Sequence, residues 1–208
     1  MRSLFLYFSL ALLLAASGCS LFYPSVKLIE EKPFYEYGGQ LEDDYFHSPV
    51  GDLAGRYPKG WLQANIEHIQ DLENVGFVYT NIDRNWAMIL QEIPGSADLR
   101  RRYELQGLLA IAEESINLHR TKNNNFSISR APELFKQSRM RFANYEIVRG
   151  YADTATWSRY VVFTTGIRYY ELGMIQLRPV GPPNPYLENY RLLQSVISSL
   201  EGVPIHSD

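Results

Sequence analysis

Two apolar runs separated by a short polar link stand out in the first half of the chain. Residues 75–82 read VGFVYTNI and residues 86–93 read WAMILQEI, with Asp83, Arg84 and Asn85 between them. Two such runs joined by a few polar residues predict a β-hairpin. Both runs are more apolar than strict alternation requires, so we expect strands that are covered on both faces.

A helical pattern follows this hairpin. Ser96 is a suitable N-cap, and Asp98 suits the positive end of a helix dipole. The pattern predicts a single amphipathic helix from Ala97 to about Leu118, because apolar residues recur at spacings of three and four. The expected buried stripe consists of Leu105, Leu108, Leu109, Ala112, Ile116 and His119.

Three strand-like stretches and a second helix complete the pattern. The stretches cover residues 139–151, 157–164 and 167–177, and Thr165-Gly166 is a hairpin signal between the last two. The last helix is expected to begin near Asn184, with Pro185 at its first position. Its expected buried stripe is Leu187, Tyr190, Leu193, Ile197 and Leu200.

The order of these elements predicts an α+β fold. Strands, helix, strands and helix follow one another, and the short links between strands favour an antiparallel meander. An antiparallel β-sheet with two main amphipathic helices packed on it buries both helical stripes.

The apolar run at the N-terminus predicts a signal peptide and not an element of the fold. Leu4 to Ala16 is uncharged and follows Arg2, but a helix needs roughly 20 apolar residues to span a bilayer. A basic start, a short apolar stretch and small residues at its end are typical of a cleavable signal peptide.

The end of this run resembles the bacterial lipobox. Small residues, Ala16, Ser17 and Gly18, lead directly into Cys19, although leucine is more usual than alanine at the position of Ala16. The resemblance implies that residues 1–18 are removed and that the Cys19 thiol receives a diacylglycerol, which anchors the protein to a membrane. Ser20 follows the cysteine, which in enteric-type sorting favours the periplasmic face of the outer membrane. The alternative is an ordinary signal peptide with an incidental cysteine.

The mature chain divides into a spacer and one domain. Residues 19–44 hold the lipidated cysteine and a segment rich in acids, with Pro33 and Gly38-Gly39, which reads as a linker. Residues 45–208 have the length and apolar content of a single globular domain.

The charge balance excludes a typical nucleic-acid-binding protein. Removal of Arg2 with the signal leaves 19 basic residues (20 minus 1) against 23 acidic ones. Nucleic-acid binders usually carry a strongly basic domain or stripe instead.

No motif identifies a catalytic or metal site. The four histidines show no metal-ligand spacing, and we expect no metal and no cofactor. Adjacent carboxylates such as Glu113-Glu114 point in different directions and do not face each other across a cleft. His119 is expected to be structural, at the negative end of its helix.

The most distinctive charged segment is the run of three arginines, Arg100, Arg101 and Arg102. Cations near a helix N-terminus are unfavourable to the helix dipole. The run therefore indicates either contact with anionic headgroups or an acidic partner, or a solvated face whose side chains lie over apolar surface.

A second resemblance concerns the mature domain. The motif RYPKGW, residues 56–61, looks like the Pro-x-Gly-Trp turn near the start of proteins of the PsbP-like superfamily. Ser198-Ser199-Leu200 corresponds to the Ser-Ser-Leu motif near the C-terminus of that superfamily. The resemblance covers residues 45–201. It implies an antiparallel sheet sandwiched by helices and a structural role for Pro58, Gly60 and Trp61, with Gly60 turning the chain and Trp61 closing one end of the core. Members are mostly non-enzymatic: they dock on larger complexes, help assembly or have no assigned role.

These features favour a membrane-anchored, non-catalytic lipoprotein that binds or helps assemble an envelope protein complex. Two alternatives stay open: a carrier of a small apolar ligand or lipid, and an enzyme whose site is built from scattered residues.

Overall fold

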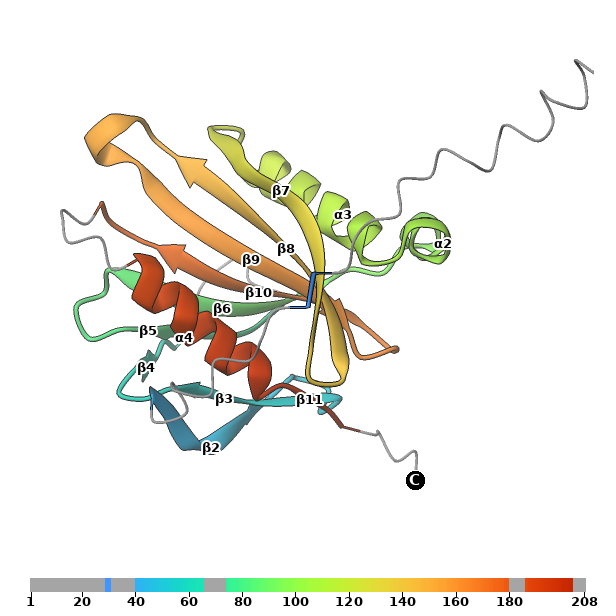
Figure 1. Cartoon of the computed structure of the whole chain (residues 1–208), viewed down its shortest axis with the longest axis horizontal. Helices are drawn as coiled ribbons and strands as arrows, with labels where there is room; N and C mark the ends of the chain where they lie inside the picture. Colours follow the sequence, from blue (N-terminus) through green and yellow to red (C-terminus); the bar gives the residue numbers. More distant parts are fainter. Residues whose placement is uncertain (1–28, 31–39, 66–73, 180–185, 204–208) are drawn as a thin grey trace, which may run out of the picture.

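The fold is organised around one large, twisted sheet (Figure 1). The computed structural model describes residues 29–30, 40–65, 74–179 and 186–203. Across the sheet, the strands follow the order β1 (Ile29–Glu30), β7 (Phe126–Gln137), β8 (Met140–Arg149), β9 (Thr156–Thr164), β10 (Tyr169–Gln176), β6 (Trp86–Ile93), β5 (Val75–Thr80) and β4 (Leu62–Gln63). β1 runs parallel to β7, and the other neighbours are antiparallel.

The remaining described elements cover the two faces of this sheet. They are a small sheet of β11 (Glu201–Gly202), β3 (Leu53–Pro58) and β2 (Leu41–His47), the helices α2 (Ala97–Gln106), α3 (Leu108–Lys122) and α4 (Tyr186–Ser198), and the short 3-10 helix η3 (Ala152–Thr154). Helices α2 and α3 pack on one face, whereas α4 and the small sheet pack on the other (Figure 1). The α+β fold expected from the sequence is therefore confirmed.

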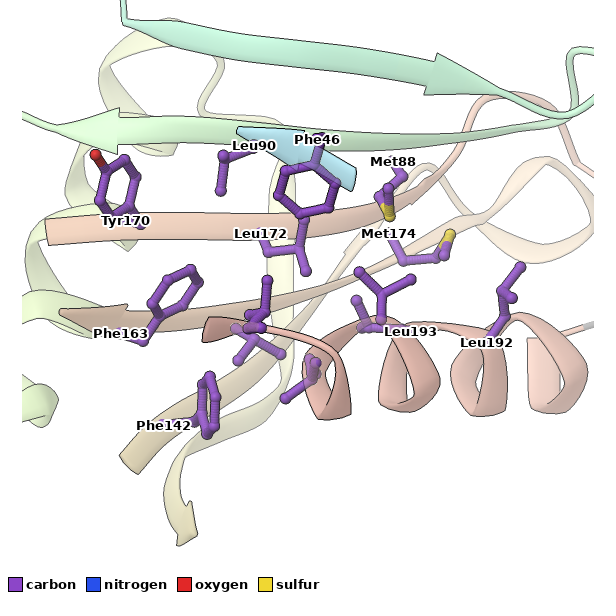
Figure 2. Packing of buried hydrophobic residues seen from close by; sticks show 14 of the residues in the cluster. Phe46, Met88, Leu90, Phe142, Phe163, Tyr170, Leu172, Met174, Leu192 and Leu193 are labelled. Carbon is purple, nitrogen blue, oxygen red and sulfur yellow. The ribbon is translucent and has the colours of Figure 1, made fainter. Parts of the chain in front are cut away.

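Alternation along the central strands produces two separate cores. On β10, Tyr170, Leu172 and Met174 point toward α4, where they pack with Leu193 and its neighbours (Figure 2). The intervening positions, including Ile175, pack toward α3. Successive strand residues point to opposite faces, so a strand covered on both sides is apolar at nearly every position.

The hairpin predicted at residues 75–93 is present as β5 and β6. The polar link between them forms a turn in which Arg84 has a φ of 53°. Trp86, Ala87 and Met88 are all buried although they alternate between faces, which confirms that β6 is covered on both sides.

The prediction of a single helix at residues 97–118 is wrong in one respect. Gly107 has a φ of 63° and a ψ of −143°, outside the helical region, and it separates α2 from α3. Leu105, placed in the predicted stripe, is 76% exposed because α2 and α3 have different axes. A glycine adopts this backbone conformation without steric cost, which explains why the break lies there.

The sequence pattern also missed β7, the longest strand described. It contains Pro132, and its pairing with β8 shifts register between Ile128 and Glu133. These irregularities interrupt the alternation from which a strand is recognised. β1 and the first residues of β2 lie within residues 19–44, the range assigned to the linker.

Register defines two ends of the large sheet. One transverse row joins Ile29 to Phe135 and Phe142, and another joins Phe163 to Tyr170 and Glu92. We call this the β1 end; it also carries the β7–β8 turn, the β9–β10 turn and the start of α2 (Figure 1). The opposite, far end carries the β5–β6 turn and the β8–β9 connection with η3.

Gly173 on β10 packs closely against the ring of Tyr160 on β9, and this contact predicts the effect of a substitution. A Cβ atom on Gly173 would lie 2.8 Å from Tyr160 Cε1 and 2.9 Å from Cδ1, and Tyr160 is itself buried. We expect Gly173→Ala to lower the free energy of unfolding by about 1–3 kcal/mol through overpacking. Denaturant titration measures this, and Gly202→Ala, whose Cβ would meet no atom within 4 Å, is the control. Equal stability of the two variants would contradict this packing.

Candidate interaction surfaces

A buried carboxylate connects α3 to the sheet. Glu171 on β10 is 2% exposed and lies between the sheet and the helix. Its oxygens accept hydrogen bonds from Gln91 Nε2 at 2.6 Å and from Tyr145 OH at 2.6 Å. Ser115 Oγ also donates to it, and His119 Nε2 lies 3.1 Å from Oε1. Residues from α3, β6, β8 and β10 therefore meet at one carboxylate.

The environment of Glu171 favours its ionised form. Burial alone would raise the pKa of Glu171, but positive charge on His119 and hydrogen bonds from His119, Ser115 and Tyr145 outweigh it, and the pKa lies below its ordinary value of 4.5. Burial and the neighbouring carboxylate raise the pKa of Tyr145 well above its ordinary value. The proton thus stays on the phenol and the charge on the carboxylate.

A second buried carboxylate joins the small sheet to the large one. Asp52, in the β2–β3 turn, is fully buried. It accepts hydrogen bonds from Tyr170 OH at 2.6 Å, Ser48 Oγ at 2.7 Å and Thr165 Oγ1 at 2.7 Å. Burial acts to raise the pKa of Asp52, but these hydrogen bonds dominate, and the pKa lies below its ordinary value. Asp52 therefore ties the β2–β3 turn to the β9–β10 turn.

Both clusters have the composition of structural networks. Each carboxylate has several donors from the surrounding fold, which is how buried charge is normally compensated. Within the described residues, no group of three or more histidine, cysteine, aspartate or glutamate side chains is arranged to hold a metal ion. His119 contacts Glu171, and His47 is exposed; His68 and His206 lie outside the described residues.

A polar cleft of about 440 Å³ opens at the β1 end. It lies between the start of α2 and the β9–β10 turn, and its lining includes Glu92, Arg100, Tyr103, Ile167, Arg168 and Tyr169. Arg168 Nη1 lies 2.5 Å from Glu92 Oε1 and 2.6 Å from Oε2. The carboxylate raises the pKa of Arg168, which keeps this guanidinium charged.

The three arginines singled out from the sequence have different surroundings. Arg100 lines the cleft, and both Arg100 and Arg101 are exposed. Arg102 is half-buried, with its Nε 2.9 Å from Asp98 Oδ2 and its Nη2 bonded to Glu114. Arg102 thus joins α2 to α3, whereas the first two arginines present their charge to solvent.

The PKGW turn lies away from this cleft. Pro58 is buried at the end of β3, and Gly60 has a φ of 74° and donates its N–H to Glu42 at 2.8 Å. Trp61 is half-buried and packs against the core on the α4 side. Cys19 and the signal-like residues before it lie outside the described residues.

Large apolar side chains are exposed along the far end. Leu62, Thr80, Ala87, Ile175, Ser158 and Ile147 form a transverse row near this end. Just beyond or on this row, Leu62 is 53% exposed, Ile82 73%, Tyr151 81% and Leu177 46%. Scattered apolar residues are normal on a surface, and these four are distributed along the far end from β4 to the β8–β9 connection.

Little in the sequence indicates that Glu171 and Asp52 are buried. Glu171 lies in a strand that otherwise reads as apolar, YYELGMIQ, and this single charge in a covered strand is the available signal. Asp52 follows Gly51 in a turn-like context, where aspartate is common and usually exposed.

No known protein family and no curated protein matches this chain by sequence. Solved structures do match its fold. The solution structure of cyanobacterial PsbP (CyanoP) from Synechocystis sp. PCC 6803 is 12% identical, with a TM-score of 0.52 over 77% of this chain and 92% of that one. This is a PsbP-like fold. The fold expected from the resemblance is confirmed, and identity this low shows the fold alone.

Two further structures match at lower TM-scores. The Ran-binding protein Mog1p from Saccharomyces cerevisiae is 12% identical, with a TM-score of 0.46 over 78% of this chain and 96% of its own. A protein from Bacteroides thetaiotaomicron is 18% identical, with a TM-score of 0.47 over 78% of this chain. The present chain spans about half, 49%, of the length of the Bacteroides protein.

No helix within the described ranges is long and apolar enough to cross a membrane.

The Glu171 cluster predicts a pH-dependent loss of stability. Because the pKa of Glu171 is lower in the folded state than its ordinary value of 4.5, ionised Glu171 stabilises the fold above that pH, and this contribution is lost as pH falls through the folded pKa. We expect Glu171→Gln to lower the free energy of unfolding by about 2–4 kcal/mol at pH 7. The difference in the free energy of unfolding between this variant and wild type should become smaller as the pH is lowered.

Denaturant titrations between pH 7 and 3 measure this difference. Glu113→Gln makes the same chemical change at an exposed position of α3, the helix that contacts Glu171, so it is the matched control and should have little effect. A constant deficit across this pH range would contradict the role given to the Glu171 charge.

Proposed function

We propose that the protein is a lipid-anchored, non-catalytic lipoprotein of the bacterial envelope whose far end binds a protein partner. Cys19, as the last residue of a lipobox-like sequence, carries the lipid. The anchor holds the domain at the periplasmic face of a membrane, with the outer membrane favoured by Ser20. The observation that carries partner binding is the set of exposed apolar side chains along the far end.

The position of β1 supports an anchored protein with one exposed working end. Residues 20–28 are the only residues between Cys19 and Ile29, which pairs with Phe135 at the β1 end. The far end lies at the other end of the same strands, so a domain tethered through Ile29 leaves that end accessible to a second protein.

The chemistry of the far end suits a protein partner. Ile82 and Tyr151 project from two turns, where they are 73% and 81% exposed. Tyrosine is among the residues most enriched at the energetic centres of protein interfaces, and an exposed isoleucine beside it adds apolar area that binding can bury. Asp83 and Asp153, both exposed in the same turns, provide polar groups beside them.

The described clusters of ionisable groups support a non-catalytic role. The carboxylates of Glu171 and Asp52 are both buried and hydrogen-bonded to neighbouring elements. Their arrangement accounts for the joining of helix to sheet and sheet to sheet without any reaction.

The carrier alternative has less support from the described packing. Between the large sheet and α4, the space is occupied by side chains such as Leu172, Met174 and Leu193 (Figure 2). The groove of about 470 Å³ between α3 and β7 is open to solvent, and its lining combines polar Glu113, Asn117 and Arg120 with apolar Leu109, Ile116, Ile128 and Pro132.

Substitution at the far end tests this proposal. The full-length protein and its Ile82→Ser/Tyr151→Ser variant are expressed at native level, crosslinked in cells and purified in mild detergent. We expect the double variant to lose its crosslinked envelope partner about tenfold or more, because both exposed anchors are removed. Leu105→Ser, an equally exposed apolar residue on α2, should retain the partner.

The same preparations test the anchor independently. The intact mass of the mature chain should equal residues 19–208 plus an acylated cysteine. An unmodified Cys19 would contradict the anchor. An acylated protein whose double variant and Leu105→Ser variant crosslink equally would contradict the far-end interface, and co-purifying lipid in place of a protein would favour the carrier.

A further inference from the structure

We propose that the β1 end of the domain is a binding surface for anionic phospholipid headgroups and lies against the membrane that carries the anchor. This inference rests on the lipid anchor proposed above, because the anchor brings the β1 end to the bilayer. It goes beyond the anchor in stating which surface faces the membrane and which chemistry it recognises.

The length of the tether brings the β1 end close to the bilayer. Ten peptide steps separate Cys19 from Ile29, and an extended chain covers at most about 35 Å over that length. Ile29 lies in register with Phe135, two residues before β7 ends. The end of the sheet that carries β1 therefore stays within that distance of the lipidated cysteine.

The cleft lies at the same end of the sheet as the tether. Ile29 on β1 is in register with Phe135 on β7, which pairs with Phe142 on β8. Glu92 on β6 is in register with Tyr170 on β10, which pairs with Phe163 on β9, the strand next to β8. With strands about 4.8 Å apart, the five steps from β1 to β6 span about 24 Å. Tether and cleft are thus close enough to face one planar surface together.

Four exposed arginines gather at this end. Arg100 and Arg101 lie in the first turns of α2, and Arg139 and Arg141 lie in and after the β7–β8 turn. Within the part of the chain that the structure describes, none of these four forms an ion pair.

The carboxylates nearby do not neutralise these arginines. Glu92 is paired with Arg168, and Asp98 is paired with Arg102. Glu104 is exposed one turn further along α2. The four arginines therefore outnumber the exposed carboxylate of Glu104.

The location of Arg100 and Arg101 has an energetic cost in the isolated domain. Both lie near the N-terminus of α2, where the helix dipole and the free N–H groups favour negative charge. An anionic phosphate at this position would interact favourably with the arginines and with the helix terminus. The cleft of about 440 Å³ next to Arg100 provides space for a headgroup.

An apolar side chain projects from the same end. Ile167, at the tip of the β9–β10 turn, is 63% exposed and is followed directly by Arg168. Tyr103 and Tyr169 lie behind it with ring centroids 5.4 Å apart. Exposed apolar and aromatic groups bordered by arginine are the composition that proteins use at the membrane interface. Asp52 holds this turn in place through Thr165.

Vesicle binding by the unlipidated mature chain tests the headgroup surface separately from the anchor. Residues 20–208 contain every described element and are made without signal peptide or lipid. Binding is measured to neutral phosphatidylcholine vesicles and to vesicles that also contain anionic phosphatidylglycerol. We expect binding only to the anionic vesicles, weakening as salt is raised.

Paired arginine substitutions assign the binding to the β1 end. We expect Arg100→Gln/Arg101→Gln and Arg139→Gln/Arg141→Gln each to weaken partitioning about 25-fold, since one cation near an anionic surface is worth about fivefold. Arg84→Gln/Arg178→Gln makes the same change in charge with two exposed arginines at the far end and should retain most of the binding. Unfolding curves confirm that all variants are folded.

Several outcomes would overturn the proposal. Equal binding to both kinds of vesicle, or equal loss in the far-end variant, would show that the β1 end is not a headgroup surface. Loss of the crosslinked partner in the Arg100/Arg101 variant without loss of vesicle binding would assign these arginines to an acidic protein instead. The vesicle measurements depend neither on acylation of Cys19 nor on a protein bound at the far end, so their failure is distinguishable from failure of the proposed function.

Discussion

The parallel pairing of β1 with β7 is the constraint on which the proposed orientation of this protein depends. Ile29 and Glu30 add two residues to the edge of the large sheet, beside Phe135 and Lys136. This short pairing fixes the point at which the chain enters the fold, ten positions after Cys19. Without it, the first described strand would begin at Leu41, and a tether of 21 residues would leave the orientation of the domain unconstrained.

Two of the buried carboxylates, Glu171 and Asp52, hold neighbouring elements of the domain together. Glu171 joins α3 to three strands, and Asp52 joins the small sheet to the β9–β10 turn. Buried charges with several donors are costly to disrupt, because removing one donor leaves the others around an undercompensated carboxylate. The turns at the β1 end therefore keep a fixed arrangement, and the surface that they form can act as a unit.

The resulting molecule has different chemistry at its two ends. Exposed arginines and one projecting isoleucine occupy the end where the chain enters, and exposed Leu62, Ile82, Tyr151 and Leu177 occupy the other. Both surfaces are built from turns and helix starts at the ends of the strands, where side chains can be exposed without disturbing the cores. This division suits a protein that is held at a membrane and presents its other end to a partner.

Local patterns in the sequence predict much of the fold but little of its surfaces. Alternation and short polar links identify β6, β8, β9 and β10, because these strands are long, apolar and covered by helices. β7 escapes detection because Pro132 and shifts of register break its pattern, and the break at Gly107 depends on how α2 and α3 pack.

The candidate surfaces depend on contacts between distant segments. The run of three arginines is visible in the sequence, but only the structure separates Arg102, paired with Asp98 and Glu114, from its two exposed neighbours. Arg139 and Arg141 join Arg100 at one end because β7 and β8 turn there, which no local pattern reports. The same holds for the donors around Glu171, which come from positions between Gln91 and Tyr145.

The orientation of the acylated protein on a bilayer is the most direct test of this account. Because Cys19 is the only cysteine in the sequence and its thiol carries the lipid in the proposed acylated form, a single introduced cysteine can carry a fluorophore. Ala97→Cys places it at the start of α2, and Asp153→Cys places it in η3; both native residues are exposed. With a quencher attached to lipid headgroups, the account predicts strong quenching at position 97 and weak quenching at position 153. Equal quenching at both positions, or stronger quenching at 153, would contradict it.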